Sequence, residues 1–241
     1  MIKITNKNEL ANLMINDEDI TKYDYSSITD FSEMFYGSYL EEIPQLQNLD
    51  MSNVKTAESM FENCQKLKKV PKLNTNKLVN ASQMFCYCPA LEEFPDMNYS
   101  KIKNALEMFK GCTSLKNVPN INFKKVEECY GMFNFCSELK SCLVNVENAK
   151  SIYGMFSDCP NLEEVSKEGN FKNLQNITTL FYSSNKIKTD ISNCKFYCKA
   201  KMKLKWKLGK YSGEVIDEKS WQEYKKVMGK KKKLGPWARF L

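Results

Sequence analysis

The chain has 241 residues, of which 42% are hydrophobic and 12% aromatic, enough to form a substantial core and to exclude general disorder. It contains no histidine, which excludes a histidine-dependent catalytic triad and a zinc site with imidazole ligands. The net charge of +7 is uneven, because residues 186–241 hold 17 of the 36 basic residues but only 5 of the 29 acidic ones. The two parts of the chain need separate explanations.

The first 26 residues are expected to form a short strand and a helix that cap one end of the fold. Residues 1–10 lack the apolar core of a secretory signal, and no stretch approaches the ~18 apolar residues of a membrane span. Ten cysteines that need not pair suit a reducing compartment. These features predict a cytoplasmic protein, with surface display or secretion by an unrecognised route as the alternative.

Residues 27–191 contain an internal repeat. The dipeptide Met-Phe recurs at intervals of 23–26 residues, and in five of its six copies a cysteine and a leucine follow the methionine by four and seven residues. The copies begin at Met34, Met60, Met84, Met108, Met132 and Met155, with Leu180 as a degenerate seventh. A fixed period of this length is typical of solenoids.

Each repeat combines two kinds of pattern. Val54, Ala57, Met60 and Phe61 have the spacing of one face of a short helix, whereas residues 67–73, LKKVPKL, favour an extended segment. One strand and one short helix per repeat predict an α/β repeat solenoid. The expected fold is a leucine-rich-repeat array of about seven units, with a cap at each end.

The recurring cysteines are expected to fill the core. Cys88 belongs to a series at one position of the repeat, and stacked neighbours with parallel side chains lie too far apart for disulfides. Cys86 lies outside that series, and the pair Cys194 and Cys198 does not complete a tetrahedral zinc site. We therefore expect no metal and no cofactor.

Residues 64–85, CQKLKKVPKLNTNKLVNASQMF, and 112–133, CTSLKNVPNINFKKVEECYGMF, resemble the BspA-like leucine-rich repeats, also called DUF285 or mycoplasma-type repeats. The resemblance covers about residues 8–191. It implies a solenoid binding module and not an enzyme, in a family of mostly bacterial surface and adhesin-like proteins with similar arrays in phages and protists.

Outward-facing residues of the extended segments are candidates for partner binding. They are Glu41, Glu42, Lys68, Lys69, Glu92, Glu93, Lys116, Lys140, Glu163 and Glu164, and their first three pairs alternate in sign. Such alternation either keeps neighbouring repeats in register or forms a charge-patterned recognition surface. Tyr87 and Tyr99, with Phe123, Phe135 and Tyr153, are candidate hot spots, of which about half are expected in the core.

Residues 192–241 form the basic end. In residues 198–211, CKAKMKLKWKLGKY, every second residue from Lys199 to Lys207 is lysine, which predicts a strand with one charged face. This strand and a helix over residues 217–228 either cap the array or bind a polyanion such as nucleic acid. The candidate polyanion-binding residues are Lys199, Lys201, Lys203, Lys205, Lys207, Lys230, Lys231, Lys232, Lys233, Trp237 and Arg239. The lysine run could also contact an anionic membrane or be a solvated tail.

The chain has no phosphate-binding glycine loop, nucleophile elbow or zinc-protease motif. The sequence therefore predicts a non-catalytic protein that recognises a macromolecular partner, above all a protein, and blocks or bridges it. The alternatives are a polyanion binder that uses the basic end and a surface adhesin-like protein.

Overall fold

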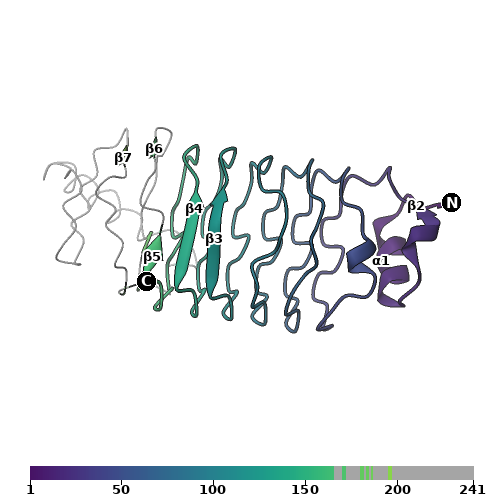
Figure 1. The fold of residues 1–241 in the computed structure, drawn as a ribbon, viewed down its shortest axis with the longest axis horizontal. Coiled ribbons are helices and arrows are strands. Elements are labelled where there is room, and N and C mark those ends of the chain that lie inside the picture. Colours follow the sequence, from purple (N-terminus) through teal and green to yellow (C-terminus); the bar gives the residue numbers. More distant parts are fainter. Residues whose placement is uncertain (166–169, 172–179, 182, 185, 187–194, 197–241) are drawn as a thin grey trace, which may run out of the picture.

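The structure is a computed structural model that describes residues 1–165, 170–171, 180–181, 183–184, 186 and 195–196. Successive repeats form parallel rungs that stack side by side into an elongated array (Figure 1). The predicted repeat solenoid is confirmed as an architecture. The full number of repeats and the basic end from residue 192 fall largely outside the described residues.

The extended segments pair in parallel along one side of the array. Strands β3 (Asn117–Asn122), β4 (Ser141–Asn145) and β5 (Glu164–Val165) form a three-stranded sheet. Earlier rungs have isolated parallel bridges at this side, such as Leu73 with Met97. A further parallel pair joins β6 (Asn170–Phe171) and β7 (Lys195–Phe196).

Strand β1 (Ile2–Lys3), helix α1 (Lys7–Ile15) and strand β2 (Tyr23–Asp24) lie at the N-terminal end of the array (Figure 1). The Asn6 side chain caps α1 by accepting a hydrogen bond from the backbone N–H of Asn8 at 2.8 Å. Leu10 and Met14 are fully buried, so the helix covers the first rung with its apolar face. Two short 3-10 helices, η1 (Ile20–Lys22) and η2 (Leu46–Asn48), complete the helical content of the described residues.

The short helix predicted in each repeat is wrong. Residues 57–63 form consecutive turns, because Ser59 and Asn63 have φ values of 53° and 60°, in the left-handed region that an α-helix excludes. The N–H of Phe61 donates to the carbonyl of Met84 in the next rung at 2.9 Å, whereas that of Met60 donates within its own turn to Ala57 at 3.2 Å. The backbone N–H groups are thus satisfied alternately between rungs and within each turn.

This arrangement recurs at the same place in six rungs, which we call the turn ladder: residues 31–37, 57–63, 81–87, 105–111, 129–135 and 152–158. In each rung, positive φ recurs one residue before the Met of the Met-Phe dipeptide and three residues after it. These residues are Glu33, Gly37, Ser59, Asn63, Gln83, Tyr87, Glu107, Gly111, Gly131, Phe135, Gly154 and Asp158.

The Met-Phe dipeptides lie within the turn ladder, and their side chains form the core on its inner side. Phenylalanines of successive rungs stack with ring centroids 5.3–5.8 Å apart and interplanar angles of 2–13°, from Phe35 to Phe181. Rings at this separation gain about 0.5–1.5 kcal/mol per pair beyond their area burial. The stack therefore favours in-register placement of each rung on the next.

The prediction that the recurring cysteines lie in the core is confirmed, and each has a further role. The Cys112 thiol donates to the carbonyl oxygen of Phe85 in the preceding rung at 3.1 Å. The same bond is made at 2.9–3.1 Å by Cys64, Cys88, Cys136 and Cys159, and the hydroxyl of Ser184 donates to the Phe156 carbonyl at 2.6 Å. All eight cysteines of the described residues are free thiols and buried.

Candidate functional site

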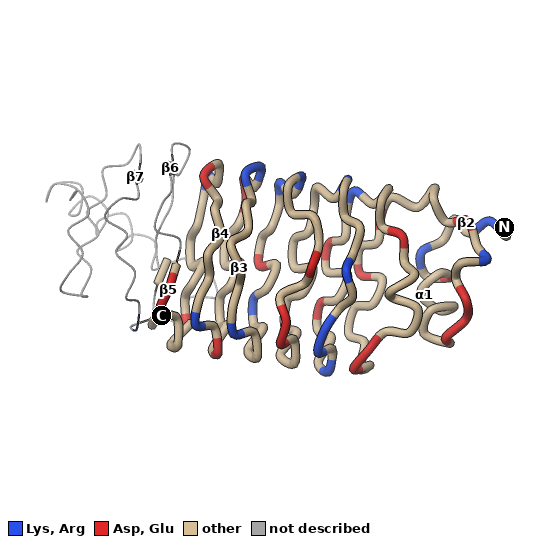
Figure 2. The backbone as a smooth tube through the Cα atoms, viewed as in Figure 1, with Lys and Arg blue, Asp and Glu red and all other residues tan. Residues whose placement is uncertain are grey.

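The predicted charged residues form a line along one edge of the array, which we call the doublet row: Glu41, Glu42, Lys68, Lys69, Glu92, Glu93, Lys116, Lys140, Glu163 and Glu164. Red and blue alternate along this lower edge over the first rungs in Figure 2. The first three doublets line a shallow depression. From Lys116 to Lys140 the alternation ends, because adjacent rungs there carry the same sign.

Ion pairs between rungs join the first doublets. Lys68 Nζ donates to Glu41 Oε2 at 2.9 Å, and Lys69 lies 3.9 Å from Glu42. The side-chain hydrogen bond between Lys68 and Glu41 lowers the pKa of the carboxyl and raises the pKa of the amine. Since all four side chains are exposed, these pairs match the register interpretation but leave the row accessible to a partner.

The candidate hot spots separate into core and surface residues. The structure corrects the expectation that Tyr99 binds a partner, because this side chain is only 5% exposed. Its hydroxyl donates to the Pro95 carbonyl, and its ring centroid lies 4.9 Å from that of Phe123. Phe123 is fully buried as well. Tyr87 and Phe135, by contrast, are 41% and 48% exposed. Tyr99 is therefore not available to a partner, whereas Tyr87 is.

Four of the five exposed aromatic side chains of the described residues belong to the turn ladder, and we call the outer side of that ladder the turn face. Besides Tyr87 and Phe135 it displays Tyr36 and Tyr130, which are 53% and 41% exposed. Tyr130 stacks on Tyr153 of the next rung with centroids 5.0 Å apart. Tyr36 and Tyr130 are missing from the sequence-based candidates, although their places two residues after and before the Met could have identified them.

Tyr87 lies flat over the next rung because that rung has a glycine beneath it. A Cβ atom on Gly111 would lie 2.6 Å from Cδ1 of Tyr87. Lys110 Nζ is 5.6 Å from the centroid of the Tyr87 ring and 2.6 Å from Oε1 of Glu107. Partial burial lowers the pKa of Lys110, but the hydrogen bond to Glu107 and the negative charge of Glu107 together outweigh this effect, and the net shift is upward. Lys110 is therefore a cation held against an aromatic ring.

The backbone conformation under Tyr87 and Phe135 is costly. Both residues have positive φ, 55° and 60°, where a non-glycine residue loses about 1–2 kcal/mol. The equivalent residues of the other rungs are Gly37, Asn63, Gly111 and Asp158, all of types that enter this region more readily. Two bulky rings thus occupy strained positions on the surface, where burial compensates little.

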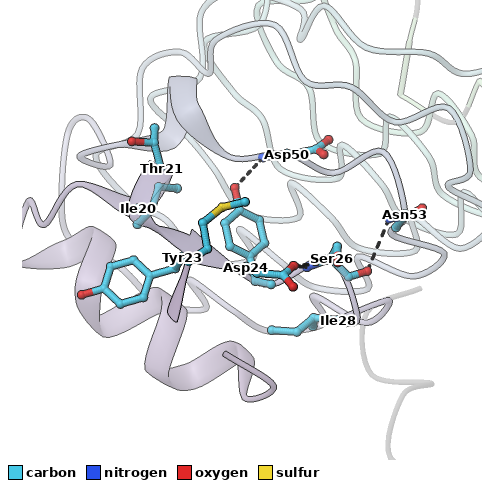
Figure 3. A pocket seen from close by; sticks show the side chains of 10 residues that line it. Ile20, Thr21, Tyr23, Asp24, Ser26, Ile28, Asp50 and Asn53 are labelled. Carbon is cyan, nitrogen blue, oxygen red and sulfur yellow. Dashed lines mark hydrogen bonds between the residues drawn. The ribbon is translucent and has the colours of Figure 1, made fainter. Parts of the chain in front are cut away.

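A small pocket at the N-terminal end is lined by Tyr23, Asp24, Tyr25 and Asp50 among other residues (Figure 3). Its polar groups are engaged with one another: the Tyr25 hydroxyl accepts from the N–H of Asp50 at 3.0 Å, and Asp24 accepts from Ser26 at 2.7 Å. Burial raises the pKa of Tyr25. These side chains stabilise the junction between β2 and the first rungs, and they do not form a nucleophile–base pair.

The predicted polyanion-binding residues, from Lys199 to Arg239, lie outside the described residues, as do Cys194 and Cys198. Within the described part, no group of three or more Cys, Asp or Glu residues is arranged to hold a metal ion. None of the helices described there has the length and apolar character to cross a membrane.

Stacked parallel rungs with a buried leucine in each define a leucine-rich repeat solenoid, and the family follows from the sequence match. The chain belongs to the family described as "Mycoplasma protein of unknown function, DUF285", which matches residues 4–120, 29–146 and 103–208. This confirms the family resemblance drawn from residues 64–85 and 112–133. No curated protein matches the sequence.

Two solved structures are similar to this chain. One is the T. pallidum leucine rich repeat protein, with 25% identity over 57% of this chain and a TM-score of 0.40. Another is a leucine rich cell surface protein from Faecalibacterium prausnitzii, with 26% identity over 47% of this chain and a TM-score of 0.39. The matched regions span 63% and 30% of those two chains.

Proposed function

We propose that this protein is a non-catalytic binding protein whose repeat array recognises a protein partner. The observation that carries this proposal is the gathering of exposed aromatic side chains, Tyr36, Tyr87, Tyr130 and Phe135, on the turn face. Aromatic residues dominate the energetic hot spots of protein interfaces, whereas isolated exposed rings need no explanation. A rigid array that displays several of them suits a protein that blocks a partner or bridges two.

The doublet row is the second candidate surface for the same function. Its first three doublets form an accessible charged depression, in which Glu92 and Glu93 lie beside Lys68 and Lys69. Charge patterns of this kind set partner choice and association rate more than affinity. We keep its ten residues as candidates for steering a partner towards the array.

The location of the protein remains part of the proposal. The cytoplasm is the expectation from the sequence, and surface display is the alternative, since one of the two similar structures is described as a cell surface protein. Immunodetection on intact and on permeabilised source cells separates them: signal only after permeabilisation supports the cytoplasm, and signal on intact cells supports the surface.

Capture of partners on the immobilised full-length chain tests the proposed function. The wild type is compared with a turn-face variant, Y36S/Y87N/F135N, and with a doublet-row variant, E41Q/E42Q/K68Q/K69Q, whose net charge equals that of the wild type. We expect source-cell proteins that the wild type retains and that one of the two variants releases. Identical retention by all three, or retention of nucleic acid alone, would contradict protein recognition by the array.

A further inference from the structure

The turn face has an electrostatic character of its own. Its segments carry five carboxylates, of which two are exposed and three partly exposed, and one lysine, Lys110, which is already paired with Glu107 at 2.6 Å. The carboxylates are Glu33, Glu58, Glu62, Glu107 and Asp158. Among the described residues, Glu33 and Glu62 form no ion pair. The rings therefore lie in a field of excess negative charge, which attracts cations and repels polyanions.

The placement of the rings points to recognition by side chains. Tyr87 and Phe135 occupy the left-handed positions that other rungs give to glycine, asparagine or aspartate, and both remain nearly half exposed. A bulky residue at positive φ whose strain is only partly compensated by burial is grounds for a functional hypothesis. The strain is tolerated where it projects a ring outward from a rigid rung.

The backbone of the turn face cannot add a strand from a partner. Alternate N–H groups donate to the neighbouring rung, such as Phe85 to the Met108 carbonyl at 2.9 Å, and the others close local turns, such as Cys86 to Gln83 at 2.9 Å. β-strand addition requires free backbone donors and acceptors. Rings and carboxylates are therefore what a partner meets.

We propose that the turn face docks a basic polypeptide segment, one rich in arginine and lysine. This inference rests on the proposed function and names its surface and its partner class. Cationic side chains of the partner lie over the faces of Tyr87 and Phe135 and pair with the surrounding carboxylates. The chain contains an example of this contact, since Lys110 lies over the Tyr87 ring while bonded to Glu107.

The test measures fluorescence anisotropy of two labelled dodecapeptides with the full-length chain at 150 mM salt. One peptide alternates arginine with serine, and the other alternates glutamate with serine. We expect saturable binding of the arginine peptide and none of the glutamate peptide. Y87N/F135N should weaken binding at least tenfold although no charge changes, and the variant should remain folded because asparagine tolerates positive φ.

A matched pair of charge variants separates docking from general attraction of a polycation. E33Q/E62Q removes two carboxylates from the turn face, and E92Q/E93Q removes two from the doublet row. We expect the first to weaken binding about tenfold and the second less than twofold.

Any of three results would overturn the inference. The arginine peptide does not bind, its binding is unaffected by Y87N/F135N, or the two charge variants weaken its binding equally. If Y36S/Y87N/F135N nevertheless abolishes capture of a source-cell protein, the proposed function stands, but the partner segment is not basic. If the chain self-associates and Y87N/F135N abolishes this self-association, the inference of a separate basic partner is overturned, and the turn face binds a second copy of the chain.

Discussion

The inner and outer sides of the turn ladder are built from the same short segments but follow opposite rules. Inside, the rungs repeat one solution: a phenylalanine stacked at 5.3–5.8 Å and, from the second rung on, a cysteine or serine bonded to the preceding rung. Outside, three residues after each Met, the rungs carry Gly37, Asn63, Tyr87, Gly111, Phe135 and Asp158. Uniform interior bonding fixes the register, and the outer residues are thereby free to differ. The residues that stabilise the array and those of the proposed recognition surface thus lie on opposite sides of the same chain segments.

The largest expected effect is alkaline destabilisation by the interior thiols. Burial raises the pKa of Cys86, Cys129 and Cys159 to about 12, against about 8.5 for a thiol in the unfolded chain. Because the folded pKa is raised, this stabilisation is complete below pH ~8.5 and is lost as the pH rises towards 12. The free energy of unfolding should fall by about 1.4 kcal/mol per pH unit for each thiol.

Urea unfolding between pH 8 and 10 measures this slope. Cys86→Ala should reduce it by the contribution of one thiol, since Cys86 is buried but lies outside the recurring cysteine positions. A slope that is the same in the variant and the wild type would mean that the thiol is solvated in the folded protein.

Removal of one ring from the stack should be the most damaging single substitution. Phe109 lies between Phe85 and Phe133 at 5.5 and 5.4 Å and also contacts Phe94 at 4.9 Å. Phe109→Ala should lower the free energy of unfolding by about 3–5 kcal/mol in urea titrations. Phe135→Ala on the outer side is the control and should change it by less than about 0.5 kcal/mol. Similar losses at both positions would remove the distinction between the two sides.

The bond from the cysteine to the preceding rung should matter more than the identity of the donor. Cys112→Ala leaves the Phe85 carbonyl without its side-chain donor and should cost about 1–3 kcal/mol. Cys112→Ser should cost less, because Ser184 already makes the same bond to Phe156 at 2.6 Å in a later rung. Thermal and urea unfolding rank the stabilities of the two variants. A serine variant less stable than the alanine variant would contradict the expected order.

Two glycines at equivalent outer positions separate backbone strain from the contact with Tyr87. Gly37 and Gly111 have φ values of 69° and 72°, but only Gly111 has a ring above it, since a Cβ atom at Gly37 has no neighbour within 4 Å. Gly37→Ala should cost about 1 kcal/mol through its backbone alone. Gly111→Ala should cost about 1 kcal/mol more, and Tyr87→Ala should remove that excess in a double-mutant cycle. Equal costs at both glycines would show that the Tyr87 ring shifts freely.

The sequence predicts the interior of this protein well and the outer side poorly. The period of the Met-Phe dipeptides was sufficient to infer the solenoid, and the constancy of Cys88 and its equivalents was sufficient to infer their burial. The short helix was wrong because the left-handed residues that prevent it include Ser59 and Gln83, whose side chains carry no signal for positive φ.

The surface candidates show the same limit. Tyr87 and Tyr99 are both tyrosines at variable positions, and only the packing of Tyr99 against Phe94 and Phe123 separates core from surface. Likewise, the doublet row was evident from its alternating signs. The turn face became evident only when the rungs brought Tyr36, Tyr87, Tyr130 and Phe135 to one side.

The smallest expected effects compare an ion pair of the turn face with one of the doublet row. The side chains of Lys110 and Glu107 are only 19% and 16% exposed, whereas those of Lys68 and Glu41 are 54% and 60% exposed. Lys110→Gln should therefore lower the free energy of unfolding by about 1 kcal/mol. Lys68→Gln should give no resolvable shift of the urea midpoint, because water and salt screen that pair. If the two substitutions cost the same, the doublet row would be part of the structural register and not a free surface, and the turn face would be left as the candidate for recognition.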